Sequence, residues 1–181
     1  MESSSNEPRD RNIFVVGFLS FFGGISQEVF SPILPVYYTA VLGFDKTFVG
    51  VAEGLAAAWS SLMNVASGFF SDKFKRQKPI IFLGYFFSLV SRPLLAVFTS
   101  MPAVALLRTG DGIGKGIKDP PKDVLIANSS EKKTRGKSFG VVRMLDTLGS
   151  VAGPLLLFGL LFFLKQNPAM YRDILFFSAV P

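Results

Sequence analysis

Long apolar runs separated by short polar stretches dominate the chain. We predict a membrane-spanning helix in each long run, because crossing the hydrocarbon core takes about 20 mostly apolar residues. The expected spans are residues 13–38, 48–70, 79–99, 102–117 and 138–164, preceded by a tail of residues 1–12. A sixth apolar run, residues 174–181, is too short to cross about 30 Å at 1.5 Å per residue. The predicted fold is therefore an all-α integral membrane protein with five complete transmembrane helices and a truncated sixth.

The composition supports a membrane protein and excludes several kinds of site. Of the 181 residues, 49% are hydrophobic and 20 are Phe, and the mean hydropathy is +0.41. The chain contains no Cys and no His, which removes disulfides, thiolate nucleophiles and the usual ligands of zinc and haem. We therefore expect no cofactor and no metal site. A membrane-embedded phosphotransferase would need several carboxylates at short helical spacing to hold a divalent metal, whereas the fourth span offers only one, so we also expect no enzymatic activity.

The basic residues indicate how the helices alternate across the membrane. A hydrophilic connector is expected over residues 118–137. Together with Lys115 just before it, the tail and the loop 71–78, this connector brings thirteen Lys and Arg residues to one side of the membrane, whereas the other side has three. Because Lys- and Arg-rich short segments stay in the cytoplasm, we predict a cytoplasmic N-terminus in an inner or plasma membrane. This explains the net charge of +6 without a nucleic-acid partner.

The incomplete sixth span predicts a longer natural protein. We expect about twice this length, or a partner that supplies a second half, since the apolar run stops at Pro181 without a polar tail.

Apart from Lys115, which is counted with the connector, seven charged residues lie inside the predicted spans, where an isolated charge costs about 2.5–3.5 kcal/mol at the bilayer centre. We predict two local pairs at i, i+3 spacing, Arg108 with Asp111 and Arg143 with Asp146. A cluster of Glu28, Glu53 and Arg92 is a further hypothesis, because all three fall in the outward third of their spans. Gly84 and Ser88 share a helix face with Arg92.

Each of these charges has a functional and a structural interpretation. For Arg108 and Asp111 these are a charged group in the solute path or a pair that holds helices together. For Glu28 and Glu53 they are a proton carrier or a permanently paired carboxylate. For Arg92, beside Pro93, the structural interpretation is favoured.

The basic loop after residue 67 carries a motif. Gly68, Asp72, Lys73 and Arg76 match the pattern Gly-x-x-x-Asp-(Arg/Lys)-x-Gly-Arg-(Arg/Lys), with Lys75 in place of the inner glycine. This loop resembles the signature between the second and third helices of the major facilitator superfamily. The resemblance implies a cytoplasmic gate contact, the alternative being a loop that only sets topology.

Two further stretches resemble the same family. Arg108-x-x-Asp-Gly-x-Gly-x-Gly is similar to its fourth-helix arginine signature. In the fifth span, Arg143 and Asp146 precede Gly149, Gly153 and Pro154, and the last three resemble the family's antiporter signature, although the glycine pair that usually completes it is absent.

The resemblance covers residues 13–181 and implies the N-terminal six-helix half of a secondary transporter. Such a protein moves a small solute by alternating access between two halves. The implied activity is proton-coupled efflux by antiport, with a proton or another ion as partner. Symport, uniport and a non-transporting membrane scaffold remain alternatives.

Overall fold

The computed structural model describes residues 7–74, 76–163 and 168–178, and the regular secondary structure within these ranges is all helical. The elements are α1 (Glu7–Val36), the π-helix η1 (Tyr37–Val41), α2 (Lys46–Phe74), α3 (Gln77–Val97), α4 (Met101–Ser129), α5 (Arg135–Phe163) and α6 (Pro168–Phe177). The all-α prediction is confirmed. The last helix begins at Pro168 rather than at 174, and residues 179–181 of the expected sixth span lie outside the described residues.

Four helices are both long and apolar enough to cross a membrane within the described part of the chain. They are the α1–η1 segment, α2, α3 and α5. The 29 residues of α4 extend for about 43 Å at 1.5 Å per residue, which is also sufficient to cross. α4 is less apolar than these four helices because it contains more charged residues, several of which face the neighbouring helices.

The first span unwinds locally after its second internal proline. α1 contains Pro32 and Pro35, and the π-helix η1 follows at Tyr37. The backbone N–H of Leu42 donates to the carbonyl of Tyr37 at 3.1 Å, an i to i−5 bond that defines the wider turn. The prolines therefore mark the position of the irregularity.

The fourth helix is longer than the sequence predicted. We expected the span to end at 117 and a hydrophilic connector to begin at 118, but α4 continues through Pro120 and Pro121 to Ser129. Pro120 has no N–H to donate to the carbonyl of Gly116. The hydroxyl of Ser67 donates to that carbonyl instead, at 2.9 Å, so this carbonyl is not left without a partner. The connector is consequently short, and Lys118 belongs to a helix.

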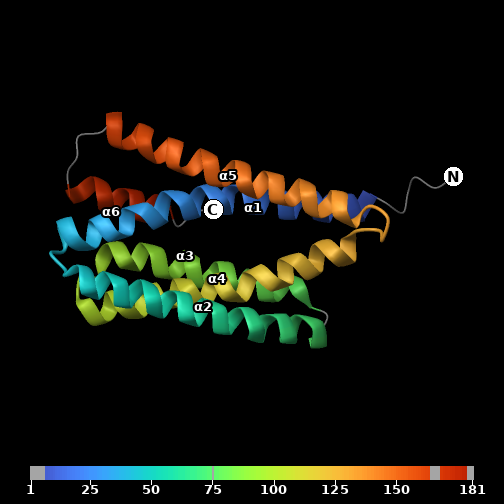
Figure 1. Ribbon diagram of the computed structural model, residues 1–181, viewed down its shortest axis with the longest axis horizontal. Helices are drawn as coiled ribbons and strands as arrows, with labels where there is room; N and C mark the ends of the chain where they lie inside the picture. Colours follow the sequence, from blue (N-terminus) through green and yellow to red (C-terminus); the bar gives the residue numbers. More distant parts are fainter. Residues whose placement is uncertain (1–6, 75, 164–167, 179–181) are drawn as a thin grey trace.

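The helices form two groups that face each other (Figure 1). α1 packs along α5, whereas α4 packs against both α2 and α3. α6 contacts α3 and α1 and so joins the groups at one end. The start of α1, the α2–α3 turn and the α4–α5 connector lie together at the opposite end (Figure 1), as the predicted alternation of spans requires.

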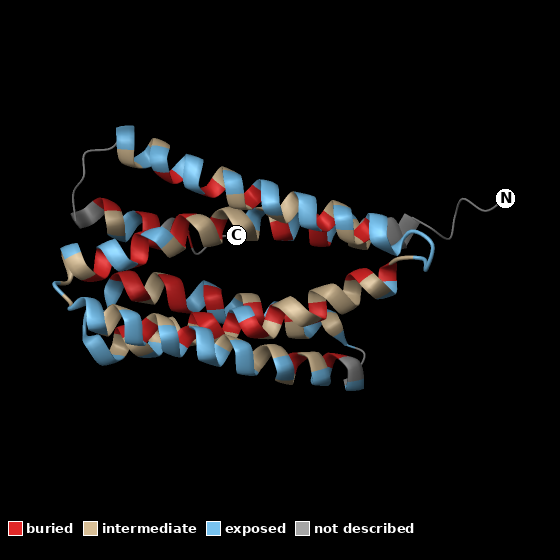
Figure 2. Ribbon diagram, viewed as in Figure 1, coloured by how far each residue is buried: buried red, intermediate tan, exposed pale blue. Residues whose placement is uncertain are grey.

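Two hydrophobic clusters hold the groups together. The larger one lies toward the η1 end and is built around Phe30, Leu34 and Leu95, with α6 contributing Ile174. The smaller one, Val16, Ile126 and Val142, lies toward the other end. Large apolar side chains such as Phe82 and Phe163 are exposed on outer faces, while buried positions follow the faces turned toward other helices (Figure 2). Outward apolar faces of this kind suit a lipid environment.

Candidate functional site

A chain of four charged side chains crosses three helices. Asp111 of α4 is 1% exposed and accepts from Arg92 Nε of α3 at 3.0 Å and from Arg108 Nη1 at 2.8 Å. Arg108 Nε and Nη2 also donate to the two oxygens of Glu53 on α2, at 2.8 and 2.7 Å. The predicted Arg108–Asp111 pair is thus present, within a larger network of two guanidinium groups and two carboxylates.

Arg92 extends this network to α1 and α6. Its Nη2 donates to Gln27 Oε1 at 2.7 Å, and its Nη1 donates to the Ser26 hydroxyl and the Ser178 carbonyl. The hydroxyl of Ser26 in turn donates to the Ser178 carbonyl at 2.6 Å. Arg92 therefore ties α3 to α4, α1 and the end of α6, which agrees with its structural interpretation.

The ionic chain is balanced in charge and buried. Arg92 is 3% exposed, and the Phe30 ring lies beneath both guanidinium groups, with centroid distances of 4.5 Å to Arg92 and 5.9 Å to Arg108. Glu53 is the open end, with 35% of its side chain exposed. Each charged group has an opposite partner, which offsets part of the penalty of placing these charges among membrane helices.

The predicted cluster of Glu28, Glu53 and Arg92 does not form. Glu53 binds Arg108 and Arg92 binds Asp111, so the two residues lie in one network but do not pair. Glu28 faces a separate cavity. The prediction rested on depth along the spans alone, and depth does not specify which helix faces touch.

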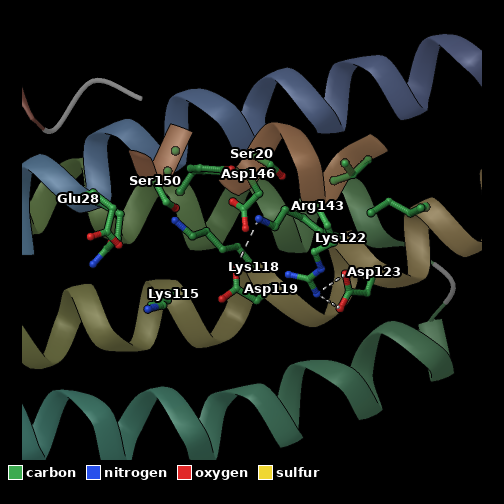
Figure 3. A pocket seen from close by; sticks show the side chains of 16 residues that line it. Ser20, Glu28, Lys115, Lys118, Asp119, Lys122, Asp123, Arg143, Asp146 and Ser150 are labelled. Atoms are coloured by element: carbon green, nitrogen blue, oxygen red, sulfur yellow. Dashed lines mark hydrogen bonds and ion pairs between the residues drawn. The ribbon is translucent and has the colours of Figure 1, made fainter. Parts of the chain in front are cut away.

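A cavity of about 300 Å³ opens between the two helix groups (Figure 3). Residues of α1, α4 and α5 form its walls, and Tyr85 contributes from α3. Eight charged side chains line it, namely Glu28, Lys115, Lys118, Lys122, Asp119, Asp123, Arg143 and Asp146. This concentration of charge between membrane-spanning helices is typical of a solute or ion path.

Two ion pairs use half of these charges. Arg143 Nη2 lies 3.4 Å from Asp123 Oδ2, and Lys122 Nζ lies 3.6 Å from Asp119 Oδ1. The predicted Arg143–Asp146 pair is therefore wrong. Asp123 lies on α4, which the sequence analysis took for a loop at that position, so this partner for Arg143 was not foreseen. Glu28 and Asp146 have no ion-pair partner within the described part of the chain.

Lys118 is the most buried of the charged cavity residues on α4, none of which the sequence analysis assigned to a site. Its ammonium group lies 4.5 Å from the centre of the Tyr85 ring, and the residue is 9% exposed. The available signal was its spacing, because Gly110, Gly114 and Lys118 repeat every four residues along one helix face. The hydrophilic character of the residues from 118 onward was taken as the sign of a connector, although the helix continues to Ser129.

The fifth-helix signature shapes the contact between α1 and α5. A Cβ at Gly149 would collide with the backbone of Phe21, and one at Gly153 would lie 2.7 Å from the Cβ of Glu28. Pro154 follows within the same helix. These glycines let α5 approach α1 closely, which places Asp146 and Glu28 at the same cavity.

The loop motif lies at the end of α2 and the start of α3. Gly68 faces Pro120 of α4, with 3.7 Å from a Cβ placed there to the Pro120 Cβ, and Lys73 Nζ lies 5.9 Å from the Phe69 ring centre. Arg76 is exposed and precedes the first turn of α3. Asp72 belongs to the last turn of α2, and its side chain lies outside the described residues.

Among the described residues, no cluster of His, Cys, Asp and Glu is arranged to hold a metal ion.

The model of the Major Facilitator Superfamily matches residues 16–170. The chain belongs to this superfamily. An uncharacterized MFS-type transporter of Methanocaldococcus jannaschii is 32% identical over 170 residues, which are 94% of this chain and 42% of that protein. The multidrug resistance protein MdtH of Yersinia enterocolitica is 25% identical over 147 residues, 81% of this chain and 34% of that protein.

Solved structures show the same major facilitator fold. A bacterial homologue of the human lysosomal transporter Spinster, in an inward-facing and unoccupied conformation, aligns with a TM-score of 0.80 at 17% identity over 99% of this chain. The inward-facing, occupied form aligns with a TM-score of 0.79. This chain spans about two fifths of the length of these proteins, 41% and 42% respectively. It is a multi-pass membrane protein of a transporter family, not of an enzyme family.

Proposed function

We propose that this chain forms the N-terminal half of a secondary transporter that exports a small solute in exchange for protons. The observation that carries the proposal is the cavity between the α1–α5 pair and α4, where Glu28 and Asp146 have no ion-pair partner within the described residues. A carboxylate that binds either a proton or a solute couples the two by competition. A second six-helix half, from the same protein or a partner, would complete the cavity and rock against this one.

The two predicted proton carriers differ in their surroundings. Glu53 is bound by Arg108 through both carboxylate oxygens, so it is committed to a salt bridge and does not face the cavity. Glu28 faces the cavity, and Asp146 lies at the same cavity on α5. We therefore assign proton handling to Glu28 with Asp146, and a supporting role to Glu53, Arg108, Asp111 and Arg92.

The orientation and the gate belong to this proposal. The α2–α3 turn and the α4–α5 connector lie at the same end as the start of α1 (Figure 1), and we place that end in the cytoplasm. Gly68, Asp72, Lys73 and Arg76 then form the cytoplasmic gate. Trypsin should cleave within residues 132–137 in everted membrane vesicles but not in sealed right-side-out vesicles. Cleavage in the opposite pattern would reverse the orientation.

The transport proposal is tested with the protein at its natural length in everted vesicles. Respiration acidifies their lumen, and exported solutes should release protons, which a dye such as acridine orange reports. Arg108→Ala should abolish this response while leaving the amount of inserted protein unchanged, because it breaks the ionic chain at its centre. Lys132→Gln, an exposed change in the connector, is the control. A full response from Arg108→Ala would remove Arg108 from the transport machinery.

The same assay separates the alternatives. A uniporter would move solute without proton movement, and a symporter would reverse the sign of the dye response. A scaffold would move no solute in any vesicle.

A further inference from the structure

Lys118 is a buried cation at the wall of the cavity. It is 9% exposed, and within the described part of the chain no carboxylate forms an ion pair with it. Its Nζ lies 4.5 Å from the centre of the Tyr85 ring. A cation–π contact gives about 2 kcal/mol when desolvated, less than the several kcal/mol that burial of an ammonium group costs. An anion bound at this position would supply the missing charge.

The position of Lys118 is fixed by its surroundings. A Cβ at Gly84 would lie 2.7 Å from the Cβ of Lys118, so the lysine stem occupies space that a larger residue on α3 would fill. The Tyr85 hydroxyl donates to the Leu19 carbonyl at 3.4 Å, which ties the ring beneath the ammonium group to α1. Lys118 is therefore held in place at the cavity wall, unlike a flexible surface lysine.

The remaining cavity charges are divided between opposite walls. Asp119 and Asp123 are used by Lys122 and Arg143. This leaves Lys118, with the exposed Lys115, on α4, and it leaves Glu28 on α1 and Asp146 on α5 (Figure 3). A ligand that matches this distribution carries a negative group toward α4 and a positive group toward α1 and α5.

We propose that the transported solute is a zwitterion of the amino-acid type, with its carboxylate on Lys118 and its ammonium group facing Glu28 and Asp146. This inference rests on the proposed function, because an ammonium group that competes with protons for these carboxylates is what proton exchange requires. The carboxylate contact adds selectivity, since a solute lacking it leaves Lys118 buried and unpaired.

The test measures binding, independently of transport. The purified protein at its natural length is mixed with each of the standard amino acids, with the amine that lacks its carboxylate, and with the acid that lacks its ammonium group. The readout is the increase in the thermal unfolding midpoint with ligand concentration. At least one amino acid should bind more tightly than both of its analogues.

Lys118→Gln should weaken binding of that amino acid at least tenfold and leave binding of the matching amine unchanged. Lys118→Arg should restore part of the affinity, and the exposed change Lys132→Gln should behave as wild type. The midpoint of each unliganded variant reports its folding. If Lys118→Gln does not fold, the comparison of each amino acid with its two analogues on the wild-type protein still tests whether the carboxylate and the ammonium group are both recognised.

Three results would overturn the inference: an amine or an acid that binds as tightly as its amino acid in every series, unchanged amino-acid binding by Lys118→Gln, or no binding of any amino acid. The vesicle assay separates this failure from failure of the transport proposal. Proton release driven by amines alone would support the antiport proposal and contradict the proposal of a zwitterionic solute. Amino-acid binding that depends on Lys118 but releases no protons would support the zwitterionic solute and contradict the antiport proposal.

Discussion

Asp111 is the one carboxylate that accepts from two guanidinium groups in the described part of the chain. It bridges Arg92 and Arg108 and lies against a close helix contact, because the next residue, Gly112, abuts the backbone of Ala56. Removing one member of a buried ionic network leaves the others uncompensated, which costs about 3–5 kcal/mol. The penalty should be greatest at the member with the least access to water.

We therefore expect Asp111→Asn to destabilise the protein far more than Glu53→Gln. Asn keeps the size of Asp but leaves two buried arginines with one fewer negative charge. The side chain of Glu53 is 35% exposed, so in Glu53→Gln water can solvate the Arg108 guanidinium that has lost its charged partner. Thermal unfolding of the purified variants in detergent measures the difference. Equal midpoints, or a lower midpoint for Glu53→Gln, would contradict the buried bridge.

At this scale the sequence predicted contacts within one helix better than contacts between helices. The Arg108–Asp111 pair follows from i, i+3 spacing, and Gly84, Ser88 and Arg92 are buried together on α3, as their shared face indicated. The contact of Arg92 with Asp111 depends on how α3 sits against α4. Asp146 does not pair with Arg143, because Arg143 forms its ion pair with Asp123 on another helix, α4. Neither relation is encoded in spacing along the chain.

The close packing of α4 against α2 depends on two glycines. A Cβ at Gly112 would collide with the Ala56 carbonyl, and one at Gly116 would collide with the Ser60 carbonyl. These are backbone atoms, which cannot rotate away as a side chain can. The glycines therefore permit the contact that brings Glu53 to Arg108.

Gly112→Ala should consequently lower the thermal unfolding midpoint and reduce transport. The matched control is Gly140→Ala on α5, where a Cβ meets nothing within 4 Å. There the change should be neutral or slightly stabilising, because Ala favours a helix by up to about 1 kcal/mol over Gly. If both variants unfold at the same temperature as wild type, α2 and α4 do not pack this closely.

The elements themselves were largely predictable, with one instructive failure. Long apolar runs place α1, α2, α3 and α5 to within a few residues at several of their ends. The fourth span was ended at 117 because the residues from 118 onward are hydrophilic, whereas α4 continues through two consecutive prolines that ordinarily end a helix. A hydroxyl on α2, that of Ser67, serves the carbonyl that Pro120 cannot reach. This hydrogen bond joins two helices, so it is a tertiary contact that the helix propensity of the local sequence cannot predict.

At the scale of the whole molecule, the two helix groups create the cavity. They are joined by the cluster around Phe30 toward one end and by the cluster around Val16 toward the other, while the cavity separates α1 and α5 from α4 between these clusters. The alternation of spans follows from the apolar pattern and basic loops. The pairing of α1 with α5, and of α4 with α2 and α3, came only from the structure, because many arrangements of six apolar helices satisfy the same pattern.

The measurement that tests the central claim most directly is the direction of proton movement in proteoliposomes. The protein at its natural length is reconstituted, an acidic lumen is imposed, and a radiolabelled form of whichever solute the vesicle assay selects is added outside. Antiport predicts that the solute accumulates inside above its external concentration while protons leave, and that nigericin, which collapses the pH gradient, abolishes the accumulation. Accumulation only when the outside is acidic, or equilibration without regard to the gradient, would contradict proton-driven exchange.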